Sequence, residues 1–255
     1  MATRMQECSE GAGRYGAAEW HARTELAALY RLVALHGWDD LIFTHISARV
    51  PGPDHHFLIN PYGLLFEEIT ASSLVKIDVD GKLAEERDDE VNPAGFTIHS
   101  AVHMAREDAQ YVMHLHTQHG IAVSAQDGGL LPVSQHALIA MPRLSYHDYE
   151  GIALDLDERE RLVSDLGDVN LMILRNHGTM ALGRSAAECW GGMYFLEKAC
   201  AHQIGALSAG RGAVRLASDE ARSTVEEQTR RGVDFDKAWA ACLRRLAREA
   251  AGYER

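Results

Sequence analysis

A His-x-His pair stands where the sequence predicts the end of a buried strand. The run Tyr111-Val-Met-His-Leu-His116 is apolar apart from its histidines. Because side chains alternate across a strand, His114 and His116 are expected on one face, about 6.5–7 Å apart at Cα, which lets two imidazoles reach one ion. His-x-His alone is more often two ordinary histidines, and the chain has 14 histidines among which pairs arise by coincidence.

A third histidine follows a second apolar run. Leu171–Leu174 leads to Arg175-Asn-His-Gly178, so His177 also stands at a strand end. Gly178 suits a tight bend that could aim this imidazole at the first pair. Three neutral histidines leave coordination positions open, as in catalytic rather than structural sites.

Several elements must position these residues. Apolar positions at helical spacing predict an amphipathic helix over Ala17–His36, with Gly37 placed to stop it. The next segments are expected to be strands at 41–50 and 56–60, forming an antiparallel hairpin, a short helix capped by Thr70, and a strand at 74–79. A helix over Thr97–Arg106 carries His99 and His103 one turn apart, a spacing that can bind metal but lacks the Glu of zinc proteases.

The second half alternates strands and helices. The expected elements are helices at 119–125 and 158–165, a mixed segment at 138–149, a short strand at 179–182, a long helix opened by the capping box Ser185-Ala-Ala-Glu188, and a final helix at 235–249. Strands that mostly form hairpins, with helices before and after them, predict an α/β fold in which helices cover an antiparallel or mixed sheet.

Composition favours one domain over residues 16–255 after a flexible N-terminal tail over residues 1–15. The net charge of -12 argues against nucleic acid or an anionic membrane surface as the main partner. The four cysteines, Cys8, Cys189, Cys200 and Cys242, lack paired spacing, as expected of reduced thiols. Without a signal peptide or an apolar run near 18 residues, we expect a cytoplasmic protein.

The chain resembles the class II aldolase/adducin family from about Glu19 to Ala209, and several segments are closest to the adducin head and its bacterial relatives. The resemblance is carried by Phe43-Thr-His-Ile-Ser-Ala-Arg49, Asn60-Pro-Tyr-Gly63, Thr70-Ala-Ser-Ser-Leu74, Asn92-Pro-Ala-Gly-Phe-Thr-Ile-His99, His114-Leu-His116, Ser145-Tyr-His-Asp-Tyr-Glu-Gly151 and Arg175-Asn-His-Gly178. It implies a three-layer α/β/α sandwich with a mostly antiparallel central sheet, usually assembled as a homotetramer with active sites between subunits.

The family's enzymes hold a divalent metal, commonly zinc, on residues that match His114, His116 and His177. Zinc is therefore the expected ion, with Fe(II), Mn or Co as alternatives. Adducin heads have largely lost this triad, so its presence here favours an enzyme.

Two departures bear on the substrate. The sugar-phosphate aldolases carry Pro-Ser-Ser-Glu where this chain has Asn92-Pro-Ala-Gly95, and their Glu is the catalytic acid/base, a role that Gly95 cannot fill. Their phosphate-loop Gly-Asn is Thr44-His45 here. Loss of the serines and of the Gly-Asn turn argues against a phosphorylated substrate.

The remaining chemistry is that of a metal-dependent lyase acting on a small non-phosphorylated hydroxy or oxo acid. Aldol cleavage and decarboxylation both leave an enolate that a Lewis acid stabilises. Tyr146, His136 and His99 are the catalytic candidates in place of the missing Glu. Tyr146 matches a tyrosine that the aldolases place near the neighbouring subunit's site, and several decarboxylases of the family have a histidine at the position of His136.

Two other classes stay open. The resemblance extends to non-haem iron oxygenases that cleave aromatic 2-oxo acids, and three histidines suit Fe(II) as well as Zn(II). A non-catalytic assembly protein, as in adducin heads, is the other. In adducin that role depends on a long basic tail, which we do not expect here because the sequence ends at Arg255.

Overall fold

The structure is a computed structural model that describes residues 13–52, 55–151 and 157–255. In chain order its elements are α2 (Ala17–Leu35), β1 (His45–Arg49), β2 (Phe57–Ile59), η1 (Phe66–Glu68), β3 (Val75–Ile77), α3 (Pro93–Ala105), β4 (Tyr111–Leu115), α4 (Gln118–Ser124), α5 (Gln135–Ala140), η2 (Met141–Arg143), β5 (Leu144–His147), α6 (Glu158–Leu166), β6 (Leu171–Leu174), β7 (Gly178–Gly183), α7 (Ala186–Leu207), η3 (Arg211–Ala213), α8 (Asp219–Thr229) and α9 (Asp236–Glu249).

One seven-stranded sheet runs through the molecule in the order β3-β2-β1-β4-β7-β6-β5. Its neighbouring strands are antiparallel except for β5 and β6, which are parallel. This mixed, mostly antiparallel sheet confirms the expected α/β class. The predicted hairpins β1–β2 and β6–β7 both form.

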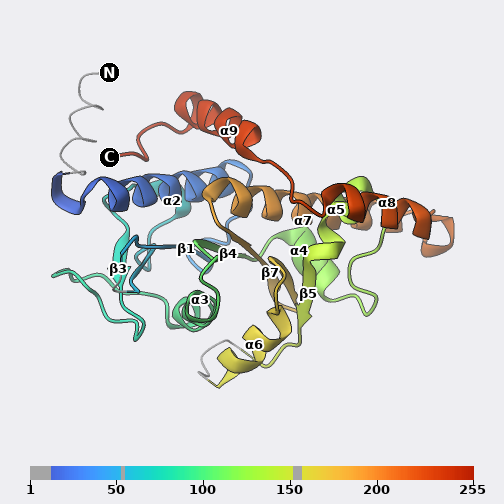
Figure 1. Cartoon of the computed structure of the whole chain (residues 1–255), viewed down its shortest axis with the longest axis horizontal. Helices are drawn as coiled ribbons and strands as arrows, with labels where there is room; N and C mark the ends of the chain where they lie inside the picture. Colours follow the sequence, from blue (N-terminus) through green and yellow to red (C-terminus); the bar gives the residue numbers. More distant parts are fainter. Residues whose placement is uncertain (1–12, 53–54, 152–156) are drawn as a thin grey trace.

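Helices cover both faces of the sheet, which makes three layers (Figure 1). α2 and α7 lie along one face with α9 outside them, and α3 and α6 lie on the other. A hydrophobic core lies on each face of the sheet, and side chains of β4 alternate between the two. Met113 and Leu115 pack toward α2 and α7, while Val112 packs toward α3 and α6. His114 therefore emerges on the α3 side.

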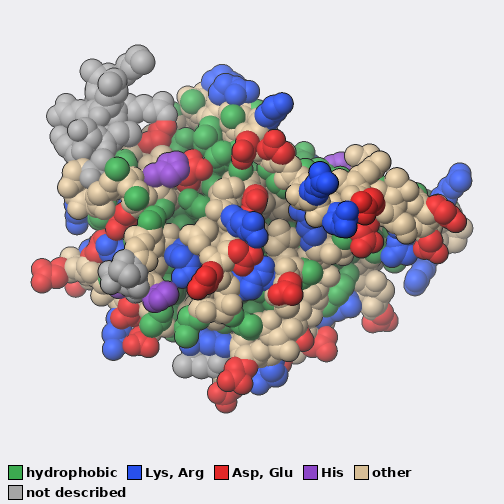
Figure 2. Space-filling model, in the orientation of Figure 1, with side chains coloured by type: hydrophobic (Ala, Val, Ile, Leu, Met, Phe, Trp, Pro, Cys, Tyr) green, Lys and Arg blue, Asp and Glu red, His purple; other side chains and the backbone are tan. Residues whose placement is uncertain are grey.

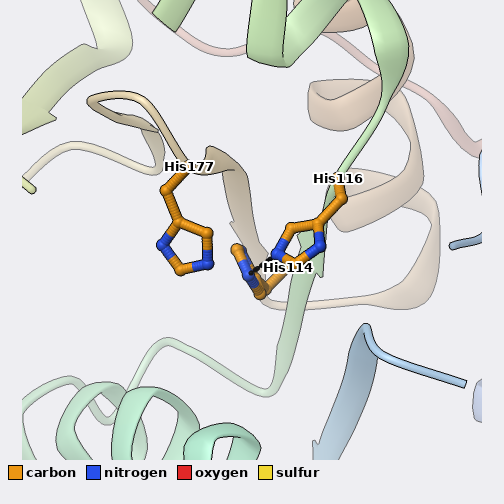
Figure 3. A group of neighbouring side chains, drawn as sticks. All are labelled: His114, His116 and His177. Atoms are coloured by element: carbon orange, nitrogen blue, oxygen red, sulfur yellow. Dashed lines mark hydrogen bonds between the residues drawn. The ribbon is translucent and has the colours of Figure 1, made fainter. Parts of the chain in front are cut away.

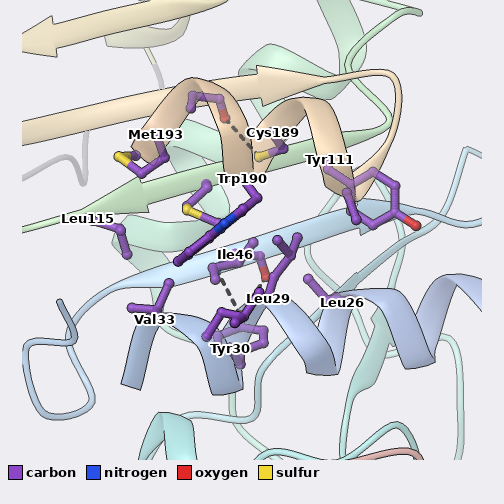
Figure 4. Close-up of a cluster of buried hydrophobic side chains, with 14 of the residues drawn as sticks. Leu26, Leu29, Tyr30, Val33, Ile46, Tyr111, Leu115, Cys189, Trp190 and Met193 are labelled. Carbon is purple, nitrogen blue, oxygen red and sulfur yellow. Dashed lines mark hydrogen bonds between the residues drawn. The ribbon is translucent and has the colours of Figure 1, made fainter. Parts of the chain in front are cut away.

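The larger core contains aromatic and aliphatic side chains from α2, β1, β4 and α7 (Figure 4). The buried Tyr30 on α2 fixes β1 within it, because its hydroxyl accepts from the Ile46 amide and donates to the Ile46 carbonyl. Burial raises the pKa of Tyr30, so the phenol stays protonated. β1 is thereby held beside β4 at the end that carries the candidate site.

Helix ends follow the sequence closely. The Ser185 hydroxyl caps α7 by accepting from the Glu188 amide, and the Glu188 carboxylate accepts from the Arg184 amide. α2 ends where Gly37 takes a φ of 64°.

One sequence prediction is wrong here, and one helix was not anticipated. Thr70 does not cap a helix: its hydroxyl accepts from the Ser73 amide and its own amide donates to Ser73 Oγ, but both bonds lie within a turn, and the nearby short helix η1 precedes it. α8 was not anticipated, since none of its residues is buried and its sequence shows no apolar face.

The N-terminal tail and the cysteines are only partly within the described residues. Residues 1–12, including Cys8, lie outside them, while Gly13–Tyr15 are helical. Cys189 and Cys200 are buried free thiols in α7.

No helix in the described part of the chain combines the length and apolar character needed to cross a membrane. On the face in Figure 2, acidic side chains lie among basic ones.

Candidate metal centre

Three imidazoles meet at one end of β4 and β7. His114 comes from β4, His116 from the chain just after it, and His177 from the loop between β6 and β7 (Figure 3). Each ring offers one nitrogen such that these atoms all lie within 4.8 Å of one another. This is the group that the strand-end pattern predicted.

The hydrogen-bond partners of two rings decide which nitrogen is free. His114 Nδ1 lies 3.2 Å from the Thr179 carbonyl oxygen, and His116 Nδ1 lies 3.0 Å from Asp40 Oδ2. Both partners can only accept, so each Nδ1 carries the proton and each Nε2 carries a lone pair.

The two lone pairs face each other. The Nε2 atoms of His114 and His116 are 3.2 Å apart, the contact dashed in Figure 3. A hydrogen bond between them would need a proton on one Nε2, but the Nδ1 partners already take that proton. Two convergent lone pairs without a proton between them fit a cation, and carbonyl or carboxylate partners behind the rings are typical of metal-binding histidines.

The protonation of the rings also fits a ligand set. Burial, together with neighbouring histidines, holds the pKa of His114 well below its usual value. Burial lowers the pKa of His177 to about 4, with His116 and His147 adding to the effect. Both imidazoles are therefore neutral at pH 7, the form that binds a metal.

The loop that carries His177 is tight. Asn176 adopts a φ of 55°, in the left-handed region that Asn tolerates better than most residues. Gly178 does not have a positive φ; a Cβ there would lie 2.5 Å from the Leu115 carbonyl oxygen. The expected bend is present, but Asn176 makes it, and Gly178 allows β7 to approach β4 closely.

A buried carboxylate holds the chain after His116. Glu197 on α7 accepts from Thr117 Oγ1 at 2.5 Å and from His119 Nδ1 at 2.7 Å. Thr117 also caps α4 by accepting from the Gly120 amide. Glu197 thereby fixes the turn from β4 into α4, where His116 sits.

The chain is similar to known proteins along most of its length. The family model for the Class II Aldolase and Adducin N-terminal domain matches residues 24–204, most of the chain. The chain belongs to the class II aldolase/adducin family.

Relatives in this family include bacterial and animal proteins. A Caulobacter vibrioides protein named for aldolase class 2 is 63% identical over 243 residues, which cover 94% of this chain and 95% of that protein. Rat alpha-adducin is 44% identical over 201 residues, which cover 78% of this chain but 27% of adducin.

Solved structures in the family share the fold. An aldolase II superfamily protein from Pseudomonas syringae has a TM-score of 0.91 at 52% identity, covering 95% of this chain and 98% of that one. An L-fuculose 1-phosphate aldolase from Glaciozyma antarctica has a TM-score of 0.80 at 24% identity, covering 92% and 94%. The second likeness shows the fold alone.

The three catalytic candidates lie in different surroundings. His99 on α3 is closest to the triad, because its ring contacts the His45 ring with centroids 5.5 Å apart. Tyr146 accepts from the Leu130 amide and lies under Arg175, while His136 packs against His202. No contact in the described chain joins either of these two to the triad.

Residues that sequence reasoning missed supply the surroundings of the triad. Asp40 and Glu197 are far from the histidines in sequence, and Tyr149 contacts His177 with ring centroids 6.1 Å apart. His45 was considered only as a departure from the family's phosphate loop, yet its ring stacks on His114. The apolar alternation that places Ile46 in the core could have placed His45 on the α3 side.

A cavity of about 390 Å³ lies at the opposite end of the same strands. It is lined by residues at the start of β4 and the end of β7, including Asp108, Leu182 and Gly183, and by several arginines. None of the triad lines it, so this cavity is separate from the candidate metal centre.

Proposed function

We propose that this protein is a metal-dependent lyase of the aldolase type that cleaves a C–C bond, by aldol cleavage or decarboxylation, in a small non-phosphorylated hydroxy or oxo acid. His114, His116 and His177 hold the metal, with zinc first and Fe(II), Mn or Co as alternatives. The observation that carries the proposal is the pair of Nε2 lone pairs facing each other at 3.2 Å.

Residues around the triad would orient the three histidines for metal binding. When bound, a divalent ion supplies Lewis acidity that stabilises the enolate left by C–C cleavage. Asp40 and the Thr179 carbonyl fix the tautomers of two ligands, and burial keeps His177 neutral. Three nitrogen ligands leave room for a substrate carbonyl or carboxylate.

One residue beside the triad supports a substrate without phosphate. The imidazole of His45 stacks on His114 at a position where the sugar-phosphate aldolases have part of their phosphate-loop Gly-Asn turn. A phosphoryl group would call for cationic or clustered amide donors there. A small carboxylate or carbonyl needs only the open metal positions.

His99, Tyr146 and His136 remain our proposed catalytic candidates. His99 is the one that the chain itself brings near the triad. Tyr146 and His136 would act at the site of a neighbouring subunit, which requires the homotetramer that the family resemblance implies. Light scattering of the purified protein tests that assembly, and a monomer would exclude both residues from the chemistry.

One alternative function is favoured by a specific observation. The described ligand set contains no carboxylate, and three imidazoles bind Fe(II) as readily as Zn(II). A three-histidine iron oxygenase acting on aromatic 2-oxo or hydroxy acids is therefore the second candidate. The similarity to alpha-adducin supports a third, a non-catalytic assembly protein.

Product analysis separates these functions. Protein loaded with zinc or with iron is incubated with a panel of 2-hydroxy and 2-oxo acids, and aldehyde, CO₂ and oxygen uptake are measured. A lyase releases aldehyde or CO₂ without consuming oxygen. Turnover that requires oxygen excludes the lyase, and a fully metallated protein inert toward the whole panel favours the assembly role.

A further inference from the structure

A buried imidazole beside the triad lacks a protein partner. His45 is 2% exposed, and neither of its ring nitrogens has a hydrogen-bond partner among the described residues. Buried polar groups are nearly always paired, so an orphan imidazole points to a missing ligand. A neutral imidazole has one donor and one acceptor, and neither is taken up by the described residues around His45.

The sheet directs this imidazole toward the metal centre. His45 on β1 and His114 on β4 are register partners in the antiparallel ladder, so their side chains share one face. Their rings stack with centroids 5.9 Å apart and an interplanar angle of 27°. The Tyr30 hydroxyl bonds both backbone groups of Ile46, the next residue, and so fixes the strand at this point.

Gly95 makes room for the ring. A Cβ built on Gly95 would lie 2.6 Å from His45 Cδ2 and 2.7 Å from its Cγ. Contacts that short do not occur, so any side chain at position 95 would displace the imidazole. Gly95 cannot act as the acid/base, but its lack of a side chain leaves space for the imidazole of His45 beside the triad.

The polar side chains near His45 on β1 and α3 hydrogen-bond one another rather than His45. His103 Nδ1 lies 2.9 Å from the Ala109 carbonyl, so it carries the proton and Nε2 accepts from Ser47 Oγ at 2.7 Å. Ser47 Oγ then accepts from His99 Nδ1 at 2.6 Å. This order leaves a lone pair on His99 Nε2, which also has no partner within the described chain.

Two orphan groups therefore define what is missing. His45 offers a donor and an acceptor, and His99 Nε2 offers an acceptor. A carboxylate or carbonyl can accept from His45, and a hydroxyl can donate to His99 Nε2 or to the second nitrogen of His45. A hydroxy acid carries both kinds of group.

We propose that His45 contacts the substrate, donating from its imidazole to the carboxylate or carbonyl of a small hydroxy acid at the open side of the triad. This rests on the proposed function, because it takes the triad as the metal centre. His45 would thus reach the substrate from β1, on the side of the site where Gly95 lies.

Co(II) and glycolate test this without knowledge of the natural substrate. Co(II) is titrated into wild-type protein and His45→Ala, and glycolate is added while the visible absorption of the ion is recorded. We expect Co(II) affinity within threefold of wild type and glycolate affinity about tenfold weaker, as for loss of one hydrogen bond to a charged group. His21→Ala, at an exposed position of α2, should match wild type.

The outcomes separate the two proposals. Wild-type protein that binds no Co(II) overturns the metal centre and, with it, this role of His45. His45→Ala that binds Co(II) and glycolate as wild type does overturns the role of His45 alone. Loss of Co(II) in His45→Ala would make His45 a metal ligand and also overturn it.

Gly95→Ala provides a second test, because it moves the ring without deleting it. The added methyl group should weaken glycolate binding about as much as His45→Ala does. In the His45→Ala background the ring is gone, so Gly95→Ala should change glycolate affinity by less than twofold. Equal effects in both backgrounds would contradict the proposal. Melting curves of the four proteins show whether each is folded.

Discussion

Asp40 Oδ2 lies 3.0 Å from His116 Nδ1, and this contact selects the nitrogen with which His116 can bind a metal. Asp40 precedes β1 in a loop, whereas His116 follows β4, so the pair joins two segments separated by 76 positions. The same end of the sheet carries the Thr179 carbonyl that orients His114. The tautomers of two proposed ligands are thus set by groups that do not touch the metal position.

Replacing Asp40 should weaken metal binding without unfolding the protein. Asp40→Ala removes the acceptor behind His116, and loss of such a partner costs roughly 10–100-fold in metal affinity. Asp40→Asn keeps an amide oxygen that can accept, so a smaller loss is expected. Zinc affinity is measured by competition with a chromophoric chelator, with Asp39→Ala as the neighbouring control. Unchanged affinity in Asp40→Ala would show that the contact does not orient a ligand.

Gly178→Ala should disrupt the triad. Its methyl group would lie 2.5 Å from the Leu115 carbonyl oxygen and 3.1 Å from His116 Cδ2. Forcing β7 from β4 should cost about 1–3 kcal/mol in the free energy of unfolding and should lower metal affinity. Urea unfolding and zinc titration measure both.

Gly205→Ala is the matched control, since nothing lies within 4 Å of a Cβ at this α7 position. Alanine there should be neutral or stabilising by up to about 1 kcal/mol. If both alanine variants behaved alike, the close approach at Gly178 would be irrelevant.

Glu197→Gln should loosen the chain beyond His116. The carboxylate accepts from Thr117, His119 and the Gly120 amide, and an amide group cannot accept all of these bonds. We expect a loss of about 1–3 kcal/mol in the free energy of unfolding. Hydrogen exchange should show earlier opening of α4 than of β4. Retained protection throughout α4 would contradict the role of Glu197.

The metal-free protein should lose stability as the pH falls below neutrality. Burial lowers the pKa of His99 and of His103 to about 3, whereas a histidine in the unfolded chain titrates near 6.5. Between these values the unfolded state binds more protons, so acid favours unfolding, and each histidine costs roughly 1.4 kcal/mol per pH unit. The loss begins near pH 6.5 and grows down to about pH 3.

Urea unfolding at several pH values from 7 to 5 measures this dependence. His99→Asn removes one of the buried histidines whose pKa is lowered, so the slope of stability against pH should fall by roughly 1.4 kcal/mol per pH unit, the value for one proton. Gly205→Ala, which removes no titrating group, should leave the slope unchanged. Stability that is flat or rises between pH 7 and pH 5 would show that these histidines are not held neutral by the fold.

The sequence allowed the convergence of the three histidines to be predicted because their positions depend on local alternation. His114 and His116 follow the two-residue period of a strand, and His177 ends another apolar run, so a sheet that joins the two strands brings them together. The resemblance to the family, carried by its motifs, predicted the helical layers on both faces of that sheet. The same local patterns predicted α2 and the Ser185 cap of α7.

The surroundings of the ligands could not be predicted in the same way. Asp40 and Glu197 reach the site from a loop and from a distant helix, and no spacing connects them to the histidines. Gly95 and Gly178 are required by close approaches to His45 and to Leu115, which exist only after the strands pair. The polar helix α8 buries nothing, so its sequence has no apolar period.

The most direct test of the account is the metal content of protein purified without chelators, measured by elemental analysis on wild type, His116→Ala and His21→Ala. The account predicts about one divalent ion per chain in wild type and in His21→Ala, and less than a tenth of that in His116→Ala. Full metal content in His116→Ala, or no metal in wild type after zinc is supplied, would contradict it.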